Sequence, residues 1–499
     1  MKPHARLPWR GACLVFLAFL IFVLPASRGA ECVSPGPGLP MLVTADCVDP
    51  VFNGDSFVVD GVTGVASPVS HTKVAAHFKP TATTPEYKVT FYLPRREKWQ
   101  RRFFQHAYPL EQPEKPGDIA FALANGGYLV NVKGTPRGRG GYRVDAAAAK
   151  LAKEYATRFY RADAGKIFGY LWGGSGGALQ TIGAAENTTG VWDGAVPYVM
   201  PNEGSLLNAN AVGALAGLAL REKLPAIAEA IKPGGTNDPF AVLSEDERAI
   251  FKEALGMGIP LRTFETVSPG SPILMFLSGG VTANDPRYVE DFWSKPGYEG
   301  SNPPPYLRKA KVDEFATVAQ VNTEADGTPT SVALDHEPRI GSAEPMGLGF
   351  WIYDSDGTTK IGVLNGALKG ASFTLGRGND AAVVKQLKRG ARLRVNNLFY
   401  LALHFYHRHA LPQGPGHYTY DQFRKADGSP RHPQRSYFAS TEQAVGTAGG
   451  GTQNGKINMK LIVLQSMVDA GAQPWMADWY SKQVLSALGE KRHAENFRL

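Results

Sequence analysis

The sequence predicts an α/β fold, in which a mostly parallel β-sheet carries helices on both faces and is interrupted by a large inserted domain. Apolar strand-like runs alternate with helical segments over residues 85–204, a rhythm typical of parallel strands joined by helices. Over residues 205–440, Ala-rich and acidic helices with Pro-rich loops replace this rhythm. It returns in residues 441–499, with a buried strand at Lys460–Leu464 and a helix from Ala477 to Leu488. We therefore expect a core in two parts, with residues 205–440 inserted as a cap.

The N-terminus has the three-part layout of a secretory signal in residues 1–30. A basic head precedes an unbroken apolar run over residues 11–24, and small residues follow up to Ala30. An uncleaved membrane anchor is the alternative, although the run is short for a membrane span. Residues 31–84 are rich in Pro, Gly and Val with short apolar runs, and predict a β-rich segment ahead of the core. The pattern indicates a secreted or periplasmic protein, with no membrane attachment once the signal is cleaved.

Charge and cysteine content narrow the class of protein further. The formal net charge is +8, but four basic residues and no acidic ones lie in residues 1–30, so half of the excess belongs to the signal. The remainder gives no indication of nucleic-acid binding. Outside the signal only Cys32 and Cys47 remain, an even number in an exported chain. They predict a disulfide, with two free thiols as the alternative.

The most informative motif is a glycine-crowded turn between a strand and a helix. The apolar strand Ile167–Leu171 leads into Gly173-Gly-Ser-Gly-Gly177, and a helix-compatible run from Ala178 to Glu186 follows. Ser175 thus stands in a Gly-x-Ser-x-Gly frame, which places a serine hydroxyl on a sharp turn ahead of a helix N-terminus. A phosphate-binding loop is the alternative, but it requires Gly-Lys-Ser/Thr and no lysine precedes Ser175. The motif predicts a nucleophilic serine.

A serine nucleophile needs a base and an acid that orients the base. In this type of fold the chain order is Ser, then Asp or Glu, then His, with the acid on a loop after a late strand. Asp469 follows the strand Lys460–Leu464 and is our candidate acid; Glu203 is the second choice. The backbone N–H groups of Gly176, directly after the nucleophile, and of Ala107, after an early strand, are the predicted oxyanion donors. We interpret His106, next to Ala107, as structural.

The histidine of this set has several candidates. His493 is the only histidine after Asp469, and it precedes the presumed last strand rather than following it. His417 and His432 of the inserted domain are alternatives. A further expectation is that the chain is incomplete and that the catalytic histidine lies beyond Leu499, on the loop after that strand.

These residues resemble the α/β-hydrolase superfamily over residues 85–204 and 440–499, and Asp193-Gly-Ala-Val-Pro197 strengthens the resemblance. Exported tannase and feruloyl-esterase relatives have a similar large cap. The resemblance implies the fold and the Ser–Asp–His arrangement, and it leaves the substrate open. In that group a cysteine typically precedes the serine, whereas Gly174 does so here.

Two other patterns partly resemble metal sites. His404 and His407 share a helix face, and we interpret them as packed cap residues rather than ligands. Asp354-Ser-Asp-Gly357 partly resembles a calcium loop, but Thr358 stands where an acid is needed, so a hairpin turn is preferred. We expect no metal and no cofactor.

The sequence thus predicts an exported serine hydrolase that cleaves a carboxylic ester, either a small molecule or a polymer. A peptidase or a polyester depolymerase on the same fold is the alternative. A non-catalytic binding protein with a degenerate Ser–Asp–His set is the alternative from another class. The oligomeric state is left open.

We expect the signal to be cleaved between Ala26 and Glu31, because small residues and the end of the apolar run coincide there. N-terminal sequencing of the exported protein checks this directly. Exported material that still begins at Met1 would favour the membrane-anchor alternative.

Overall fold

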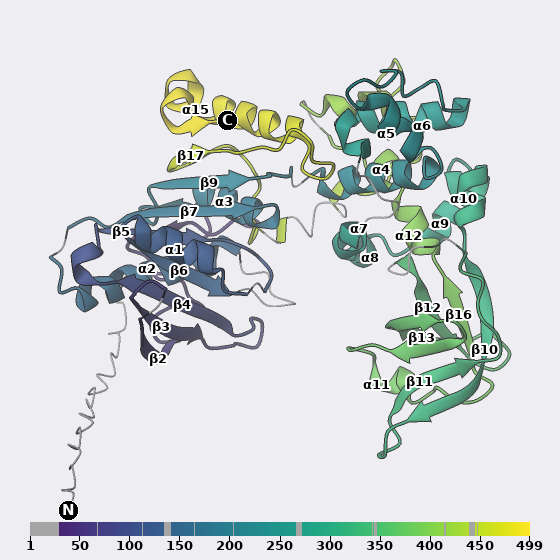
Figure 1. Ribbon diagram of the computed structural model, residues 1–499, viewed down its shortest axis with the longest axis horizontal. Coiled ribbons are helices and arrows are strands. Elements are labelled where there is room, and N and C mark those ends of the chain that lie inside the picture. The colour runs from purple at the N-terminus through teal and green to yellow at the C-terminus, as the bar shows by residue number, and fades with distance from the viewer. Residues whose placement is uncertain are drawn as a thin grey trace, which may run out of the picture.

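The computed structural model describes residues 29–499 apart from residues 67, 112, 134–140, 164, 203, 266–271, 342, 344–346, 414–415, 439–444 and 447. Two large sheets lie in two lobes (Figure 1). The predicted signal in residues 1–30 falls almost entirely outside the described residues.

The first lobe contains a nine-stranded sheet in the order β18-β17-β9-β7-β5-β6-β4-β3-β2. Strands β18, β17, β9, β7, β5 and β6 are parallel, and β4, β3 and β2 continue the sheet as an antiparallel meander. The strands are β2 (Phe57–Val65), β3 (His71–Phe78), β4 (Tyr87–Pro94), β5 (Arg102–His106), β6 (Gly127–Lys133), β7 (Phe168–Gly174), β9 (Gly194–Tyr198), β17 (Lys460–Ile462) and β18 (Phe497–Arg498). The predicted α/β class with a mostly parallel sheet is confirmed.

Four helices flank this sheet: α1 (Pro116–Ala124), α2 (Gly141–Phe159), α3 (Gly176–Asn187) and α15 (Pro474–Asn496). Right-handed crossovers put helices on opposite faces when the chain steps through the sheet in opposite directions. The connection through α1 steps from β5 to β6, whereas those through α2, α3 and α15 step towards β18. Accordingly α2, α3 and α15 share one hydrophobic core, and α1 contributes to a separate one.

The two faces of the sheet are therefore covered unequally. On the face of α2, α3 and α15, Phe103, Leu171 and Leu461 are buried. On the other face α1 covers Phe104 and Leu129. Among the described residues, β7 and the stretch from β17 to Leu464 carry exposed apolar side chains on this face: Phe168 (44%), Tyr170 (37%), Ile462 (50%) and Leu464 (56%).

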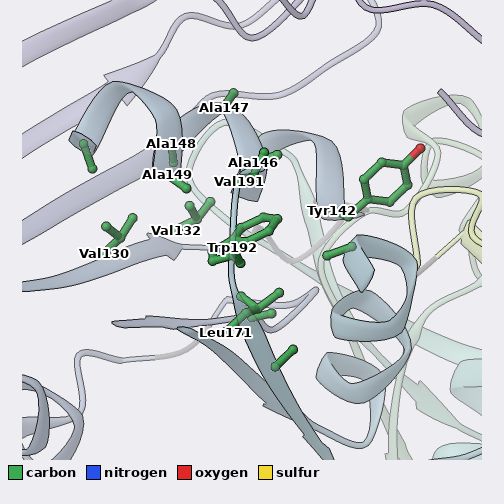
Figure 2. Close-up of a cluster of buried hydrophobic side chains, with 14 of the residues drawn as sticks. Val130, Val132, Tyr142, Ala146, Ala147, Ala148, Ala149, Leu171, Val191 and Trp192 are labelled. Atoms are coloured by element: carbon green, nitrogen blue, oxygen red, sulfur yellow. The ribbon is translucent and has the colours of Figure 1, made fainter. Parts of the chain in front are cut away.

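Small side chains bring α2 close to the sheet. Four consecutive alanines, Ala146–Ala149, are buried there beside Val130, Leu171 and Trp192 (Figure 2). Alanine adds apolar contact without lengthening the distance between helix and strand, and it loses no side-chain entropy on burial. The Ala-rich stretch thus sets the distance between α2 and the sheet.

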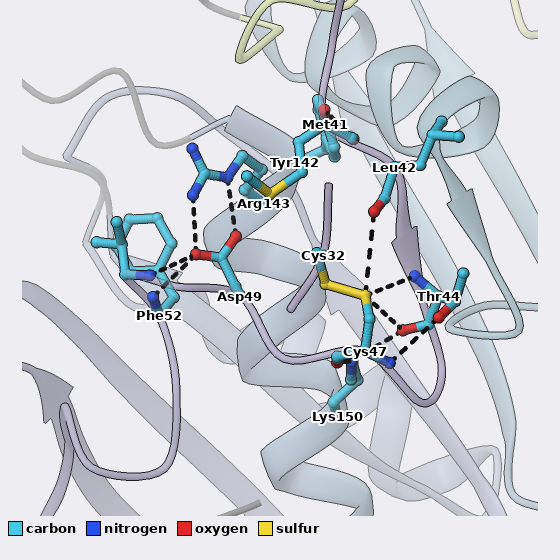
Figure 3. The surroundings of a disulfide bond; sticks show 11 residues. Cys32, Met41, Leu42, Thr44, Cys47, Asp49, Phe52, Tyr142, Arg143 and Lys150 are labelled. Atoms are coloured by element: carbon cyan, nitrogen blue, oxygen red, sulfur yellow. Dashed lines mark hydrogen bonds and ion pairs between the residues drawn. A yellow bond between two sulfur atoms is a disulfide. The ribbon is translucent and has the colours of Figure 1, made fainter. Parts of the chain in front are cut away.

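A disulfide joins Cys32 to Cys47, with 5.0 Å between their Cα atoms, as the cysteine count predicted (Figure 3). It closes a loop that packs on α2. Arg143 of α2 makes two hydrogen bonds of 2.8 Å to the carboxylate of Asp49, and Tyr142 Oη donates to the Met41 carbonyl at 2.6 Å. The N-terminal segment is thereby fixed to the core.

The chain between β9 and β17, called the insert below, contains a helical cluster and a second sheet. Its helices are α4 (Leu206–Ala219), α5 (Leu224–Ile231), α6 (Glu245–Gly256), α7 (Pro272–Leu277), α8 (Gly279–Asn284), α9 (Tyr288–Ser294), α10 (Pro305–Ala310), α11 (Ala381–Val384), α12 (Leu398–Leu403) and α13 (Tyr406–His409). The sheet is antiparallel, in the order β13-β12-β16-β10-β11-β15-β14. Its strands are β10 (Asp313–Thr323), β11 (Pro329–Leu334), β12 (Gly349–Tyr353), β13 (Lys360–Leu364), β14 (Gly366–Lys369), β15 (Ser372–Leu375) and β16 (Arg392–Asn396). Helices and sheet have separate hydrophobic cores.

The two metal-like patterns of the sequence have structural roles in the insert. Asp354 and Gly357 lie in the turn that joins β12 to β13, and Asp354 Oδ1 accepts a hydrogen bond from the Gly357 amide at 3.1 Å, so the preferred hairpin is confirmed. His407 Nε2 lies 2.6 Å from the carboxylate of Glu253, which also pairs with Arg408. Burial alone would raise the pKa of Glu253, but Arg408 and His407 outweigh it and lower the pKa to about 2.

Helix α3 is anchored at its C-terminal end by a buried carboxylate. Glu186 Oε1 accepts hydrogen bonds from the Gly455 amide (2.6 Å) and from Tyr480 Oη (2.8 Å). Burial raises the pKa of Glu186 to about 7 in spite of these donors. The folded state therefore binds a proton that the unfolded chain releases at a lower pH.

This raised pKa predicts a pH-dependent stability that Glu186→Gln removes. The stabilisation from protonated Glu186 is complete below the unfolded pKa, near 4, and is lost as pH rises through about 7. The free energy of unfolding of the variant, relative to the wild type, should therefore increase between pH 5 and pH 8, by on the order of 1–3 kcal/mol. Urea unfolding at several pH values measures it. Parallel pH profiles for the two proteins would contradict the raised pKa.

Candidate active site

Ser175 lies at the junction of β7 and α3, at the carboxyl edge of the parallel strands. Its backbone has φ 53° and ψ −117°, in the left-handed region that residues other than glycine rarely adopt. Its amide donates to the Tyr198 carbonyl at the end of β9, 3.1 Å away, and its side chain is exposed. The turn thus presents the hydroxyl to solvent at the start of a helix, as the motif predicted.

The flanking glycines are required by close backbone contacts. A Cβ atom on Gly177 would lie 2.3 Å from the carbonyl oxygen of Ala107. One on Gly173 would lie 2.6 Å from the same oxygen and 2.5 Å from that of Gly177. No side chain fits at either position, which is the physical reason for the Gly-x-Ser-x-Gly spacing.

A second residue near this turn also has an unusual backbone. Val199, directly after β9, has φ 47°, an outlier for a β-branched residue. Its amide donates to the Leu464 carbonyl at 2.8 Å, which joins the ends of β9 and β17. Backbone strain of this kind clusters at functional sites, and here two such residues follow neighbouring strands at one edge of the sheet.

The two predicted oxyanion donors differ in availability. The Gly176 amide is the first of α3, where helix geometry provides no intrahelical acceptor. The Ala107 amide donates to the Trp172 carbonyl at 2.8 Å and is already paired with β7. This bond corrects the assignment of Ala107 as a donor, because an amide paired within the sheet is not free for an oxyanion. Tyr108 is the next residue of that loop.

Asp469 follows β17 on a loop at the same edge of the sheet as Ser175. Its carboxylate accepts hydrogen bonds from the amides of Gly471 (2.8 Å) and Ala472 (2.6 Å). The loop is held by Gln465, a residue that the sequence analysis did not single out. Gln465 Oε1 accepts from the Met200 amide (2.7 Å), and its Nε2 donates to the carbonyls of Met200 (3.2 Å) and Ala472 (2.7 Å). Its position as a polar residue directly after the buried strand is the sequence signal that could have identified Gln465.

The structure does not bring His493 to Ser175 or Asp469. Its Nε2 lies 3.1 Å from Ser481 Oγ, and its ring stacks on Phe497 with centroids 5.1 Å apart. His493 precedes β18, which runs parallel to β17, so it lies towards the amino edge of the sheet, opposite Ser175.

The two alternative histidines have other neighbours. His417 lies beside Trp479, with ring centroids 6.0 Å apart, and His432 Nδ1 lies 3.5 Å from Glu299. Within the described part of the chain, no hydrogen bond or ion pair joins a histidine to Ser175 or Asp469. Glu203 lies outside the described residues.

His106, the last residue of β5, is a buried neutral group beside this site. Its ring centroid is 5.8 Å from that of Trp172, and its Nδ1 is 4.0 Å from Asp118. Burial, with a smaller contribution from Lys115, lowers the pKa of His106 to about 4. The imidazole is therefore uncharged at neutral pH.

Among the residues that the structure describes, no three or more His, Cys, Asp or Glu side chains are grouped to hold a metal ion. Likewise, no helix in the described ranges is long and apolar enough to cross a membrane.

Comparisons with known proteins find similarity to solved structures but none to family models or curated sequences. No family model matches the sequence, and no curated protein does. Among solved structures, tannin acyl hydrolase from Aspergillus niger is 10% identical. The match covers 89% of this chain and 77% of that protein's chain, with a TM-score of 0.36. Feruloyl esterase B from Aspergillus oryzae is 12% identical and matches 87% and 76%, with a TM-score of 0.35. These are the kinds of esterase that the sequence resembles, but TM-scores this low carry no argument about activity.

Replacing a glycine of the turn tests the close contact at Ala107. Gly177→Ala places a Cβ 2.3 Å from a backbone oxygen, so the free energy of unfolding should fall by about 1–3 kcal/mol. Gly213→Ala, in helix α4, is the matched control, because its Cβ would be 3.8 Å from Ile259 Cδ1, an ordinary contact. That variant should be as stable as the wild type or slightly more so. Urea unfolding compares them, and equal losses in both would argue against a special contact.

Proposed function

We propose that this protein is an exported serine hydrolase that cleaves carboxylic esters, with Ser175 as the nucleophile. The observation that carries the proposal is the conformation of Ser175: a positive φ, between a strand and a helix, with an exposed hydroxyl and glycines that no larger residue can replace. Such a turn costs stability, and strained residues of this kind cluster at functional sites. The signal-like segment and the Cys32–Cys47 disulfide support export.

In the proposed mechanism, Ser175 Oγ attacks the ester carbonyl carbon and forms a tetrahedral oxyanion. The Gly176 amide at the N-terminus of α3 donates one hydrogen bond to the oxyanion, and the helix dipole favours the negative charge. Since the Ala107 amide is paired with Trp172, we assign the second donor to the amide of Tyr108. Collapse of the intermediate expels the alcohol, and water then hydrolyses the acyl-serine.

The proton of Ser175 must go to a base that Asp469 orients. The carboxylate of Asp469 stands on the loop held by Gln465, at the same edge of the sheet as the hydroxyl. The base is proposed to be a histidine at this edge. His493 could serve only if the end of α15 and β18 were rearranged, because it lies towards the opposite edge.

We further propose that the insert acts as a cap that shapes the substrate pocket. Two contacts support this role: Thr263 Oγ1 donates to the Val468 carbonyl (3.5 Å), and Trp475 Nε1 donates to the Met257 carbonyl (3.1 Å). Both join the insert to the loop and helix that follow β17. The substrate would be a small or polymeric ester, with a peptide as the alternative.

A non-catalytic binding protein is the second candidate. It is favoured by the missing contact between any described histidine and Ser175. In that case the turn at Ser175 would be a remnant of the fold, and the hydroxyl would have ordinary reactivity.

A fluorophosphonate probe separates the two candidates, because it reacts with serines whose proton is removed by a base. Protein expressed from the complete open reading frame should be labelled, and Ser175→Ala should not be. Hydrolysis of short acyl esters should fall at least about 10³-fold in the same variant. Ser429→Ala, which alters a serine in an exposed turn, is the control and should behave as wild type. A wild-type protein that resists the probe would support the binding protein instead.

His493→Ala in the same assay locates the base. Labelling that persists in this variant would show that another histidine serves, as the position of His493 near Ser481 leads us to expect.

A further inference from the structure

The insert contains a cavity that is separate from Ser175. Its volume is about 810 Å³, and its lining includes residues of helix α9 and of strands β12, β13 and β16. All of its lining residues fall between Met275 and Phe399, so neither the turn at Ser175 nor the Asp469 loop contributes to it. Sites for small molecules have volumes of roughly 300–1,000 Å³. The cavity is therefore large enough for a ligand of its own.

The walls of this cavity combine aromatic surface with a few polar groups. Trp351 of β12, Trp293 of α9 and Phe399 of α12 supply aromatic rings, and Val363 of β13 is 51% exposed towards solvent. Large apolar side chains around a cavity favour a ligand with a flat apolar body.

One cation at the cavity lacks a counter-ion. Lys360 Nζ lies 3.9 Å from the ring centroid of Trp351, and no ion pair or hydrogen bond joins it to another described side chain. Burial, followed by the charge of Arg394, lowers the pKa of Lys360. Lys360 is exposed, and no carboxylate of the described residues pairs with its ammonium group, so the ammonium is available to an anionic ligand.

The other charged groups at the cavity are already paired with other residues or lie on the opposite wall. Arg394 makes hydrogen bonds of 2.6 and 2.8 Å to the carboxylate of Asp313. Asp285 pairs with Arg435. Glu290, on the helical wall, is exposed, and no side chain of the described residues pairs with its carboxylate. The sheet wall therefore presents a free positive charge, and the helical wall a free negative charge.

We propose that this cavity binds a small aryl carboxylate, with its carboxylate at Lys360 and its ring among the aromatic side chains of Trp351, Trp293 and Phe399. A hydrogen-bond donor at the far end of the ring, such as a phenolic hydroxyl, would face Glu290. The inference does not depend on the proposed esterase activity, because the two sites share no residue.

Tryptophan fluorescence and calorimetry with 4-hydroxybenzoate test the proposal. We expect saturable binding to the wild type, and an affinity at least roughly tenfold lower in Lys360→Gln, which loses the charge-assisted contact. Lys369→Gln, on β14 and outside the cavity, is the matched control and should bind as the wild type does. Ser175→Ala should also bind normally, so failure here and failure of the proposed esterase are distinguishable.

Two further comparisons test the chemistry of the ligand. 4-Hydroxybenzamide, which lacks the negative charge, should bind weakly to wild type and Lys360→Gln alike. Trp351→Leu should weaken 4-hydroxybenzoate more than cyclohexanecarboxylate, and if this variant does not fold, the Lys360 comparison still decides. No saturable binding by the wild type, or equal affinities in Lys360→Gln and Lys369→Gln, would overturn the proposal.

Discussion

The contact between the Ala107 carbonyl and the backbones of Gly173 and Gly177 determines the rest of the site. It allows β5, β7 and the first turn of α3 to approach more closely than any residue with a side chain would permit. The chain must then turn from strand to helix within a single residue, and Ser175 takes the left-handed conformation as a result. A strained residue of this kind costs roughly 1–3 kcal/mol, and the packing of α2 and α3 on the sheet has to offset it. The position of the hydroxyl is thus a consequence of backbone packing rather than of its own hydrogen bonds.

The parts of the core that the sequence predicted are those with a local signal. Apolar runs and glycine spacing located β7, the turn at Ser175 and the start of α3, and the even cysteine count indicated the disulfide. The position of Asp469 followed from the buried strand ahead of it. The choice of the proposed second oxyanion donor depends on the pairing between β5 and β7, because this pairing uses the Ala107 amide and leaves the next residue, Tyr108, as the candidate. No local sequence pattern indicates that one-residue difference. The side of the sheet on which His493 lies likewise depends on the direction of β18, which is a tertiary property.

The antiparallel sheet of the insert was not predicted, apart from the β12–β13 hairpin, and the reason is physical. Strand β10, from Asp313 to Thr323, mixes charged, polar and apolar residues without clear alternation. It pairs with β16, and Asp313 lies opposite Asn396, far away in the sequence. Strand preference depends strongly on such partners, so a strand whose partners are distant has little signature of its own. The histidines of α13 are a related case, since only the structure reveals that they stand beside Glu253 and Glu299.

The anchoring of α3 by Glu186 has a consequence for the order in which the protein can fold during synthesis. The acceptor on α3 and its partner Gly455 are 269 residues apart in the chain, and Tyr480 follows later still. A ribosome adds on the order of 5–20 residues per second, so the carboxylate waits many seconds for these donors. Until they emerge, strand β9 has an unpaired edge where β17 will later pair, and the Glu186 carboxylate of α3 lacks its hydrogen-bond donors. The first half of the core therefore stays incomplete over this interval, and Ser175 reaches its final surroundings only after residues 455–480 have been made.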